Sequence, residues 1–409
     1  MIFLYHISML ALELMLKVIS ISFKGKIRLG VEGRATTFQT IAEKRDFTKK
    51  LIWFHAASLG EFEQGRPLIE KMKSQYPDYQ LLLTFFSPSG YEIRKNYPHA
   101  DIITYLPIDT KRNAKLFLAA TKPDMIFFIK YEFWYYFLKT ATDKKIPTYY
   151  IAALFRPQQF FFAWYGKFMQ PILHKISHYF VQNETSKKQL ESIGIKQISV
   201  VGDPRIDRVV ELAVQTKSFP IVENFCQGKN VMVIGSSWAQ DEAILLPFIA
   251  ENTDWKFIIA PHEIDEKHLQ NVENQSLVKI IRYSKYEKNS DANLLLIDNI
   301  GMLNSLYRYG KIAYIGGGFG AGIHNTLEPM AYGLPVIFGP KYQKFEEANA
   351  MISATPQGAF SVKNNEELNV IFAFLKEEKN YAAASKTVLK YMEKNKGATG
   401  KIVKMLLTV

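Results

Sequence analysis

The chain has 409 residues, 48% hydrophobic and 22% charged, a balance typical of a globular protein with room for two domains. Its one cysteine, Cys226, excludes an intramolecular disulfide framework and a cysteine metal cluster, and fits a reducing compartment. The 51 basic and 39 acidic residues give a net charge of +12, which suits an anionic membrane face or an acidic substrate. Because no nucleic-acid-binding module or compact Lys/Arg tract accompanies this charge, no nucleic acid is expected as a partner.

The first 23 residues are mostly apolar but do not form a clean membrane span. Residues 1–12 are uncharged, whereas Glu13 and Lys17 lie one helical turn apart and can pair. Neither the basic start nor the cleavage site of a secretory signal is visible. Basic residues follow the apolar run, which favours a cytoplasmic location for the rest of the chain: Lys24, Lys26, Arg28 and Arg34. We predict a membrane-associated helix in residues 1–30, spanning or interfacial; a helix packed on the domain surface is the alternative.

Short apolar segments alternate with helical segments through the first half of the chain. Strands are predicted at residues 51–55, 80–85, 102–106, 125–129, 148–152 and 179–181. Strands separated by helices indicate a parallel, doubly wound α/β sheet. Since LIWFH runs directly into AASLGEFEQG, Glu61 falls at a strand-to-helix turn, the usual position of a functional group in an open α/β sheet. The commoner explanation is that such a carboxylate satisfies N–H groups at a helix start.

Three later segments of this half carry charged candidates. KYEFWYYF places Glu132 among aromatic residues after the strand at 125–129, where it could simply be a buried partner of a Lys or Arg. AALFRP carries Arg156, and the aromatic segment that follows, 160–168, could be core or could meet lipid. VVGDPRID carries Arg205 just before a polar, Pro-containing segment that we interpret as an interdomain linker.

The second half begins with VMVIGSSWAQDE, a strand followed by Ser236 and Ser237 at an expected helix start. Hydroxyls and free N–H groups there can hold a phosphate, although a plain helix cap explains them at least as well. Strands at 257–260 and 294–297 follow, ending in APHEIDEKH and DNIGML.

The glycine-rich segment KIAYIGGGFGAGIHNTLEPMAYGLPVIFGP, residues 311–340, predicts a strand, a loop, a helix capped by Asn325 and Glu328, and a second strand. Its glycines let the backbone turn tightly and approach a ligand. Such a βαβ unit could receive a phosphate at its helix N-terminus. On this pattern alone, a tight turn with a capped helix is an equal alternative.

Taken in order, these motifs resemble those of glycosyltransferases with two facing Rossmann-like domains, and most of all the 3-deoxy-D-manno-octulosonic acid (Kdo) transferases of lipopolysaccharide core synthesis. The resemblance rests on W-x-HA-x-S-x-GE at residues 53–61 and on GG-x-x-x-x-G-x-HN-x-LEP-x-A-x-G-x-PV-x-x-GP at residues 316–340. It covers nearly the whole chain. It implies a GT-B architecture with parallel sheets, an acceptor domain over 31–208, a linker over 209–229, and a donor domain with closing helices over 230–409.

The resemblance also implies roles for individual residues. Glu61 would be the general base, and Glu132 and Arg205 would stabilise the transition state; Arg205 replaces a family Lys with a planar, forked group. The acceptor side would include Ser58, Gly60 and Arg156. The donor nucleotide would be bound by Ser236, Ser237, Pro261, His262, Ile300, Gly301, Met302, Gly317, Gly318, Asn325, Thr326, Leu327 and Glu328. Two further segments depart from the family: His262 replaces the Arg of its Pro-Arg-His, and Ile300 to Met302 replace its Met-Gly-Glu.

The implied reaction moves Kdo from CMP-Kdo to the lipid A precursor (lipid IVA), with inversion, at the cytoplasmic side of the inner membrane. Expected partners are CMP-Kdo, the lipid A precursor and the anionic membrane surface. We expect no metal or other cofactor, because the chain has no Asp-x-Asp triplet and CMP-Kdo carries a single phosphate that a helix N-terminus and Arg205 could offset. The alternatives are another GT-B enzyme that uses a UDP-sugar, including an epimerase, and a non-catalytic membrane-associated nucleotide-binding protein.

Overall fold

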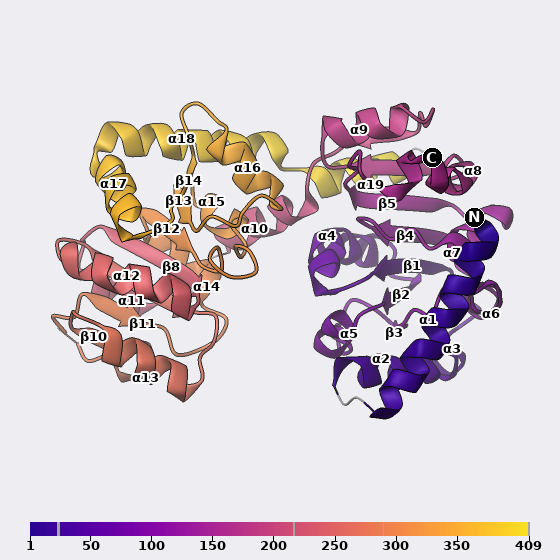
Figure 1. Ribbon diagram of the computed structural model, residues 1–409, viewed down its shortest axis with the longest axis horizontal. Coiled ribbons are helices and arrows are strands. Elements are labelled where there is room, and N and C mark those ends of the chain that lie inside the picture. The colour runs from indigo at the N-terminus through magenta and orange to yellow at the C-terminus, as the bar shows by residue number, and fades with distance from the viewer. Residues whose placement is uncertain (23–24, 216, 289, 408–409) are drawn as a thin grey trace. The chain divides into compact units, whose positions relative to one another are not determined.

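The computed structural model describes residues 1–22, 25–215, 217–288 and 290–407. The chain forms two compact units, each built on a parallel sheet of seven strands (Figure 1). The N-terminal unit comprises Met1–Asp207 together with the C-terminal residues from Gly397, and the C-terminal unit comprises Arg208–Lys396. The predicted α/β class with two Rossmann-like sheets is therefore confirmed.

The chain division differs from the predicted domain layout at two places. The predicted linker, 209–229, forms most of α10 (Pro204–Val214) and all of α11 (Pro220–Cys226). The last helix of the predicted donor domain, 230–409, belongs to the N-terminal unit instead. This helix, α19 (Ala398–Leu406), buries Ala398 and Ile402 in the core of that unit.

The sheet of the N-terminal unit has the strand order β3-β2-β1-β4-β5-β6-β7. Its strands are β1 (Leu51–Ala56), β2 (Gln80–Phe85), β3 (Ile102–Tyr105), β4 (Met125–Ile129), β5 (Thr148–Ala153), β6 (His178–Val181) and β7 (Ile198–Val200). Every residue of β1 and β2 is buried, as expected for a parallel sheet covered by helices on both faces. The order of the chain reverses between β1 and β4, which creates a topological switch point at their carboxyl ends.

Helices connect successive strands of this sheet, as the predicted alternation of strands and helices requires. They are α4 (Leu59–Gln75), α5 (Pro88–Arg94), α6 (Lys111–Thr121), α7 (Tyr135–Asp143), η1 (Phe160–Phe162), η2 (Trp164–Met169), α8 (Gln170–Leu173) and α9 (Glu184–Glu191). The indole of Trp53, at the centre of β1, packs on the rings of Phe117 and Phe128 at centroid distances of 4.9 and 5.5 Å. These aromatic contacts anchor the strand that carries the first sequence motif.

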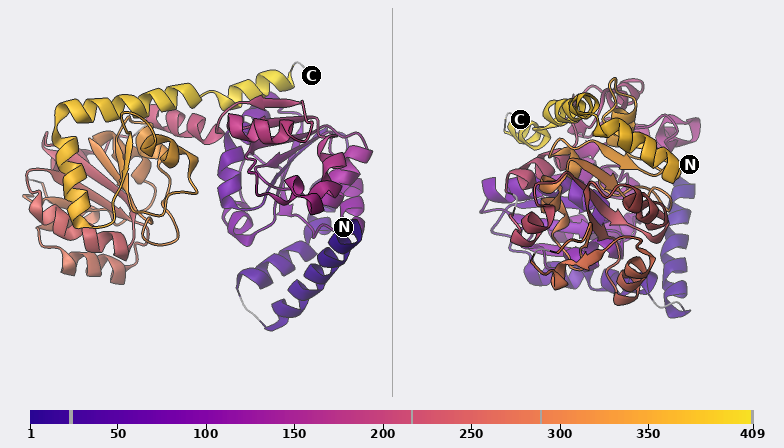
Figure 2. Two further views of the ribbon diagram at one scale, coloured as in Figure 1. Left: turned by 45° about the horizontal axis from the view of Figure 1, so that its top comes forward. Right: turned by 90° about the vertical axis from the view of Figure 1, so that its left-hand side faces the viewer.

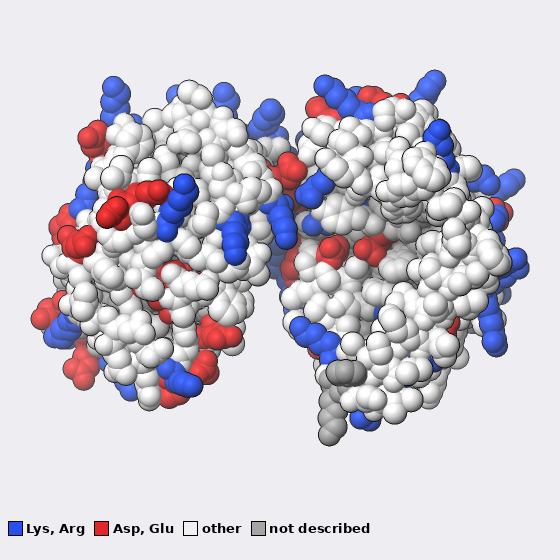
Figure 3. Space-filling model, viewed as in Figure 1, with Lys and Arg blue, Asp and Glu red and all other residues white. Residues whose placement is uncertain are grey.

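Three helices precede this sheet: α1 (Ile2–Ser22), α2 (Lys26–Ala35) and α3 (Thr37–Lys44). By length and composition α1 could cross a membrane, and none of its residues is buried. It forms a hairpin with α2 (Figure 2), and the surface over it carries few charged side chains (Figure 3). The Tyr5 hydroxyl nevertheless donates to Asp109 of the N-terminal unit at 2.6 Å. Of the predicted flanking basic residues, Lys24 lies outside the described residues.

The C-terminal unit repeats the architecture with the strand order β10-β11-β9-β8-β12-β13-β14. Its strands are β8 (Val231–Ser237), β9 (Lys256–Pro261), β10 (Ile280–Arg282), β11 (Leu294–Leu296), β12 (Ile312–Ile315), β13 (Val336–Phe338) and β14 (Ala359–Ser361). Its helices after α11 are α12 (Ala239–Glu251), α13 (Glu266–Gln275), α14 (Leu303–Leu306), α15 (Leu327–Met330), α16 (Glu346–Ile352), α17 (Asn365–Lys376) and α18 (Glu378–Asn395). The switch point of this sheet lies between β8 and β12, the two strands that precede the predicted phosphate-binding loops.

Candidate functional site

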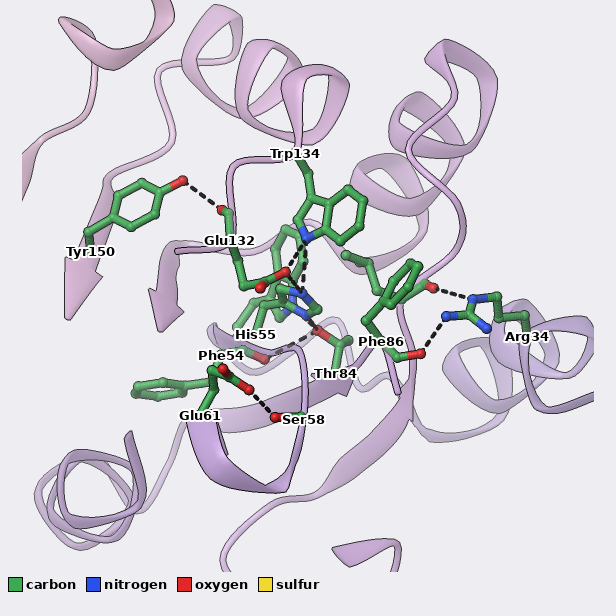
Figure 4. Close-up of polar contacts among 12 residues, drawn as sticks. Arg34, Phe54, His55, Ser58, Glu61, Thr84, Phe86, Glu132, Trp134 and Tyr150 are labelled. Carbon is green, nitrogen blue, oxygen red and sulfur yellow. Dashed lines mark hydrogen bonds and ion pairs between the residues drawn. The ribbon is translucent and has the colours of Figure 1, made fainter. Parts of the chain in front are cut away.

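The switch point of the N-terminal unit brings together the predicted carboxylates. Glu61 lies in the first turn of α4, directly after β1, and Glu132 lies in the loop directly after β4. Because β1 and β4 are adjacent parallel strands, both side chains reach the same edge of the sheet (Figure 4). This edge is the usual position of a reaction centre in a doubly wound sheet, and we call these two residues and their hydrogen-bonded neighbours the carboxylate site.

Glu61 is held by the residue that begins its helix. Ser58 is the N-cap of α4, and its hydroxyl donates a hydrogen bond to the Glu61 carboxylate. The Ser58 backbone carbonyl accepts the N–H of Phe62 at 3.0 Å, which closes the first turn. Gly60 lies exposed in the same turn, and a side chain there would have room, since its nearest neighbour would be 3.8 Å away. Ser58 therefore orients Glu61, whereas Gly60 leaves the approach to it open.

Glu132 belongs to a network of buried and half-buried rings. The indole N–H of Trp134 donates both to the Glu132 carboxylate at 2.8 Å and to His55 Nε2 at 3.2 Å. His55 Nε2 itself lies 3.6 Å from the carboxylate. The phenol of Tyr150 donates to the backbone carbonyl of Glu132 at 2.8 Å. The sequence alternative, a carboxylate buried against a Lys or Arg, is not what the described part of the chain shows.

The same network determines which nitrogen of His55 carries the proton. Because Nε2 accepts from Trp134, the neutral ring holds its proton on Nδ1 and donates to Thr84 Oγ1 at 2.9 Å. The Thr84 hydroxyl then donates onward to the carbonyl of Phe54 at 3.3 Å. His55 and Thr84 are fully buried. They form a fixed support beneath Glu132, and only the His55 part of this support was visible in the sequence motif.

The two predicted arginines of this unit lie in different settings. Arg156 is exposed in the loop after β5, where its backbone N–H donates to Gln159 Oε1 at 2.9 Å. Arg205 lies in the first turn of α10, and its Nε and Nη2 donate to one oxygen of Asp203 at 2.8 and 2.6 Å. Asp203 therefore offsets part of the charge of Arg205, the residue for which the family resemblance implies transition-state stabilisation.

In the C-terminal unit the carboxyl ends of β8 and β9 meet the glycine loop at a stack of three rings. The ring centroid of His262 lies 4.5 Å from that of Trp238 and 4.5 Å from that of His324. The Trp238 indole donates to His324 Nε2 at 2.9 Å. Burial, and secondarily the neighbouring His262, lowers the pKa of His324 to about 4, so this ring is uncharged near neutral pH. The prediction named His262 but missed Trp238, although it directly follows the strand that ends in Ser237.

Ser236 and Ser237 do not lie at a helix start as predicted. They end β8, where Ser236 has φ 55, and α12 begins two residues later at Ala239. Ser237 is fully buried, and its hydroxyl donates to Glu242 at 2.8 Å, so in this structure the hydroxyl bonds within its own unit. The carboxylate of Asp241 accepts the N–H of Trp238 at 3.0 Å. A side chain of the protein therefore already places a negative charge at the start of α12.

The glycine loop is shaped by contacts between backbones. Gly317 has φ 90 and donates its N–H to Asp241 at 2.9 Å. A Cβ on Gly318 would lie 2.6 Å from the backbone of Gly339. Pro261 is buried at the end of β9, Ile300 is 87% exposed, Gly301 has φ 91, and Met302 is buried before α14. Backbone groups thus dominate this predicted nucleotide site.

The predicted helix after the glycine loop is shorter than expected. The helix α15 has only one turn, Leu327–Met330, with Thr326 at its N-cap position. Asn325 still makes the expected contacts, because its carbonyl oxygen accepts the Leu327 N–H at 3.2 Å and its amide donates to Glu328 at 2.9 Å. A single turn carries little macrodipole, and the side chains of Thr326 and Leu327 are buried. Phosphate binding at this helix start therefore remains a prediction.

No group of three His, Cys, Asp or Glu side chains that could hold a metal ion occurs within residues 1–22, 25–215, 217–288 and 290–407.

Comparisons with known proteins place the first unit in a family. Residues 30–208 match the family model described as 3-Deoxy-D-manno-octulosonic-acid transferase (kdotransferase). The 3-deoxy-D-manno-octulosonic acid transferase of Aquifex aeolicus is 27% identical over 78% of this chain and 84% of its own length. That of Rickettsia bellii is 26% identical over 87% of each chain. A bifunctional glycosyltransferase/methyltransferase of Fusobacterium nucleatum is 26% identical over 87% of this chain, which spans 57% of that protein's length.

Solved structures share the fold. UDP-GlcNAc 2-epimerase from Neisseria meningitidis, bound to UDP-GlcNAc, aligns with a TM-score of 0.59 and 18% identity over 88% of this chain and all of its own. A putative UDP-N-acetylglucosamine 2-epimerase from Listeria monocytogenes aligns with a TM-score of 0.56 and 13% identity over 87% of this chain and 95% of its own. Together with the carboxylate site, the family match over residues 30–208 and the curated relatives indicate a glycosyltransferase similar to the Kdo transferases.

Proposed function

We propose that this enzyme transfers Kdo from CMP-Kdo to the lipid A precursor, lipid IVA, during lipopolysaccharide core synthesis, with inversion at the anomeric carbon. The observation that carries the proposal is the carboxylate site. Glu61 and Glu132 occupy one edge of the sheet, and each is oriented by its own hydrogen bond, from Ser58 and from Trp134. The similarity to Kdo transferases supports Kdo as the transferred sugar.

In the proposed reaction an acceptor hydroxyl attacks the anomeric carbon on the face opposite the CMP group. Glu61 takes the hydroxyl proton as the new C–O bond forms. The bond between the anomeric carbon and the phosphate oxygen breaks, and CMP leaves with that electron pair. Glu132 would stabilise the positive charge that develops on the sugar ring. The direct displacement requires no covalent enzyme intermediate.

The nucleotide would bind at the switch point of the C-terminal unit. The exposed His262 ring offers a face on which a base can stack, supported from behind by Trp238. Backbone N–H groups of the glycine loop and the Asn325–Glu328 pair would contact the ribose and phosphate. No metal takes part in the proposed reaction, since one phosphate needs less compensating charge than the diphosphate of a UDP-sugar.

The apolar α1 would hold the enzyme at the cytoplasmic side of the inner membrane, close to its lipid acceptor. Supporting this placement, several of its large apolar side chains are strongly exposed, including Phe3 at 72%, Leu14 at 65% and Ile21 at 84%. Basic residues after the helix would add attraction to anionic lipids.

A turnover assay tests this function. The full chain, in detergent, would be given CMP-Kdo and a tetra-acylated lipid A precursor, with UDP-GlcNAc as the matched alternative donor. We expect CMP release and a lipid product heavier by one or more Kdo units, and no reaction with UDP-GlcNAc. The shared fold of the UDP-GlcNAc 2-epimerases makes UDP-sugar chemistry the second candidate. UDP-GlcNAc turnover without CMP release would establish it, and CMP binding without transfer would indicate a binding role.

A further inference from the structure

Arg34 has an environment that the sequence pattern does not anticipate. The pattern groups it with the basic residues that follow the apolar helix, but the structure directs its guanidinium into the N-terminal unit (Figure 4). Its Nε donates to the Leu106 carbonyl at 3.1 Å, its Nη1 to the Gly30 carbonyl at 2.9 Å, and its Nη2 to the Phe86 carbonyl. Burial lowers the pKa of Arg34 to about 10, which still leaves it charged near neutral pH.

This guanidinium forms no ion pair with any described residue, and its compensation comes from carbonyl dipoles and aromatic rings. Its central carbon lies 4.4 Å from the ring centroid of Phe86 and 5.4 Å from that of Tyr105. A charge in such a setting is costly to desolvate, and an apolar side chain of the same length would avoid that cost. Fold stability alone therefore does not explain why a cation occupies this position.

Phe86 connects Arg34 to Glu61 through the backbone. Phe86 directly follows β2, and its carbonyl is held by Arg34. On the other side of the same segment, the N–H groups of Phe86 and Ser87 donate to the carbonyl of Ala57 at 3.2 and 2.7 Å. Ala57 immediately precedes Ser58, the residue that orients Glu61. Arg34 thus fixes the strand-end segment against which the Glu61 turn is built.

Phe86 also connects Arg34 to Glu132 through its ring. The Phe86 ring stacks on Trp134 with a centroid distance of 4.8 Å and an interplanar angle of 28°. The indole of Trp134 donates to Glu132 and to His55. A shift of Phe86 would tilt the indole and change the hydrogen bond that positions the carboxylate. Both predicted catalytic carboxylates therefore depend on the placement of one phenylalanine.

Arg34 is carried by the helices expected at the membrane. It belongs to α2, which forms a hairpin with α1 (Figure 2). A cavity of about 320 Å³ lies between this hairpin and the rest of the N-terminal unit. Residues from all these elements line it: Leu16, Lys17, Val31, Arg34, Phe38 and Ile108. The hairpin is therefore not fully packed against the unit, and Arg34 is one of its main polar connections.

We propose that Arg34 is a positioning residue that links the seating of the α1–α2 hairpin to the geometry of Glu61 and Glu132, by clamping Phe86. The inference rests on the proposed function, since it takes these carboxylates to be the catalytic pair. An enzyme arranged in this way is fully active only when the hairpin is seated on the N-terminal unit.

The test compares Arg34→Met with Arg45→Met, a matched control. Arg45 also donates to backbone carbonyls, of Thr121 at 2.8 Å and of Lys49 at 2.8 Å, and lies over the ring of Phe47, but it lies beside the amino end of β2. We expect Arg34→Met to lower kcat at least about tenfold with an unchanged KM for CMP-Kdo, because small displacements of catalytic groups have large effects on rate. Arg45→Met should lower stability and leave kcat unchanged.

A second readout follows Trp134 directly, by NMR of the chain labelled with ¹⁵N in its indole groups and with the resonance assigned by Trp134→Phe. Arg34→Met and Phe86→Leu should both shift the Trp134 resonance, Arg45→Met should not, and Arg34→Lys should partly restore it and kcat. A folded Arg34→Met with the parent kcat, or a lowered kcat with an unmoved Trp134 resonance, would overturn the inference. Absence of Kdo transfer by the parent would contradict the proposed function instead, and the indole shifts would still decide whether Arg34 positions Trp134.

Discussion

At the carboxyl ends of β1 and β4, the N-terminal unit presents side chains whose polar atoms contact one another. At the equivalent ends of β8 and β12, the C-terminal unit presents glycines and a stack of rings. In the first case the sequence motif encodes side-chain chemistry: Ser58, Glu61, His55 and Glu132 have hydrogen bonds that orient a reactive group. In the second case the motif encodes backbone shape, because Gly317 and Gly318 permit close approaches and Ser237 supports Glu242. Substitutions at the carboxylate site should therefore mainly lower kcat, whereas substitutions in the glycine loop should mainly lower the stability of the fold.

The largest effect is expected in the carboxylate site. Glu132→Gln removes the charge but keeps the size of the side chain, and we expect kcat to fall by about 10²-fold or more with little change in stability. Steady-state kinetics with CMP-Kdo and the lipid acceptor, together with thermal unfolding, measure both. The same substitution at Glu43, an exposed residue of α3, is the control. A kcat within twofold of the parent would remove Glu132 from the reaction.

The C-terminal unit should instead lose stability. Gly318→Ala places a Cβ 2.6 Å from the backbone of Gly339, and we expect the free energy of unfolding to fall by about 1–3 kcal/mol. Gly320→Ala is the matched control, since its Cβ would have no neighbour closer than 3.6 Å. Chemical denaturation of the full chain measures the difference. Equal stability of the two variants would show that the loop does not need its close backbone contact.

A smaller effect is expected at the ring stack. Trp238→Phe keeps an aromatic ring but removes the N–H that donates to His324. This hydrogen bond favours the neutral imidazole, so its loss should raise the pKa of His324. Because Trp238 also supports the His262 ring on which the base would stack, we expect CMP binding to weaken by about 1 kcal/mol, roughly fivefold. NMR titration of His324 and calorimetric CMP binding test the two parts. An unchanged pKa would mean that burial and the neighbouring His262 keep His324 neutral without this hydrogen bond.

The smallest effect is a pH dependence of stability. The pKa of His324 is lowered from 6.5 to about 4 in the folded chain, so between these values the unfolded chain binds the extra proton. The free energy of unfolding should therefore fall as the pH drops from about 6.5 to 4, by about 1 kcal/mol or less because the ring is partly exposed. His324→Asn should lose this component, whereas the opposing contributions of the buried Asp241 and Glu242 remain in both proteins. Identical pH profiles for parent and variant would contradict the assignment.

Local sequence signals were sufficient to predict strands with long hydrophobic runs and functional side chains that directly follow a strand. The predicted bounds of β2 and β4 agree with the structure, and Glu61 and Glu132 lie after predicted strands. The three-residue strands β7, β10 and β14 were missed because each includes a polar or charged residue that shortens its apolar run, whereas the equally short β11 and β13 are wholly apolar.

The features that were not predicted depend on tertiary contacts, which local sequence patterns do not reveal. The Ser237 hydroxyl is used by Glu242, five residues later, and α15 ends after one turn, near Gly333 with its φ of 75. The burial of Arg34 depends on carbonyls at Phe86 and Leu106, 52 and 72 residues away. Sequence composition favoured a solvated cation at that position, and only the tertiary structure reveals the clamp.

The assignment of Glu61 as the general base is tested by the effect of Glu61→Gln on Kdo transfer and on CMP binding, both measured on the same preparation. We expect the parent to convert CMP-Kdo and the tetra-acylated acceptor to product, and the variant to lose at least about 10²-fold in kcat while CMP binding is unchanged. Ser58→Ala, which removes only the hydroxyl that orients Glu61, should lose less. Transfer by Glu61→Gln at the parent rate would contradict the assignment of Glu61 as the base.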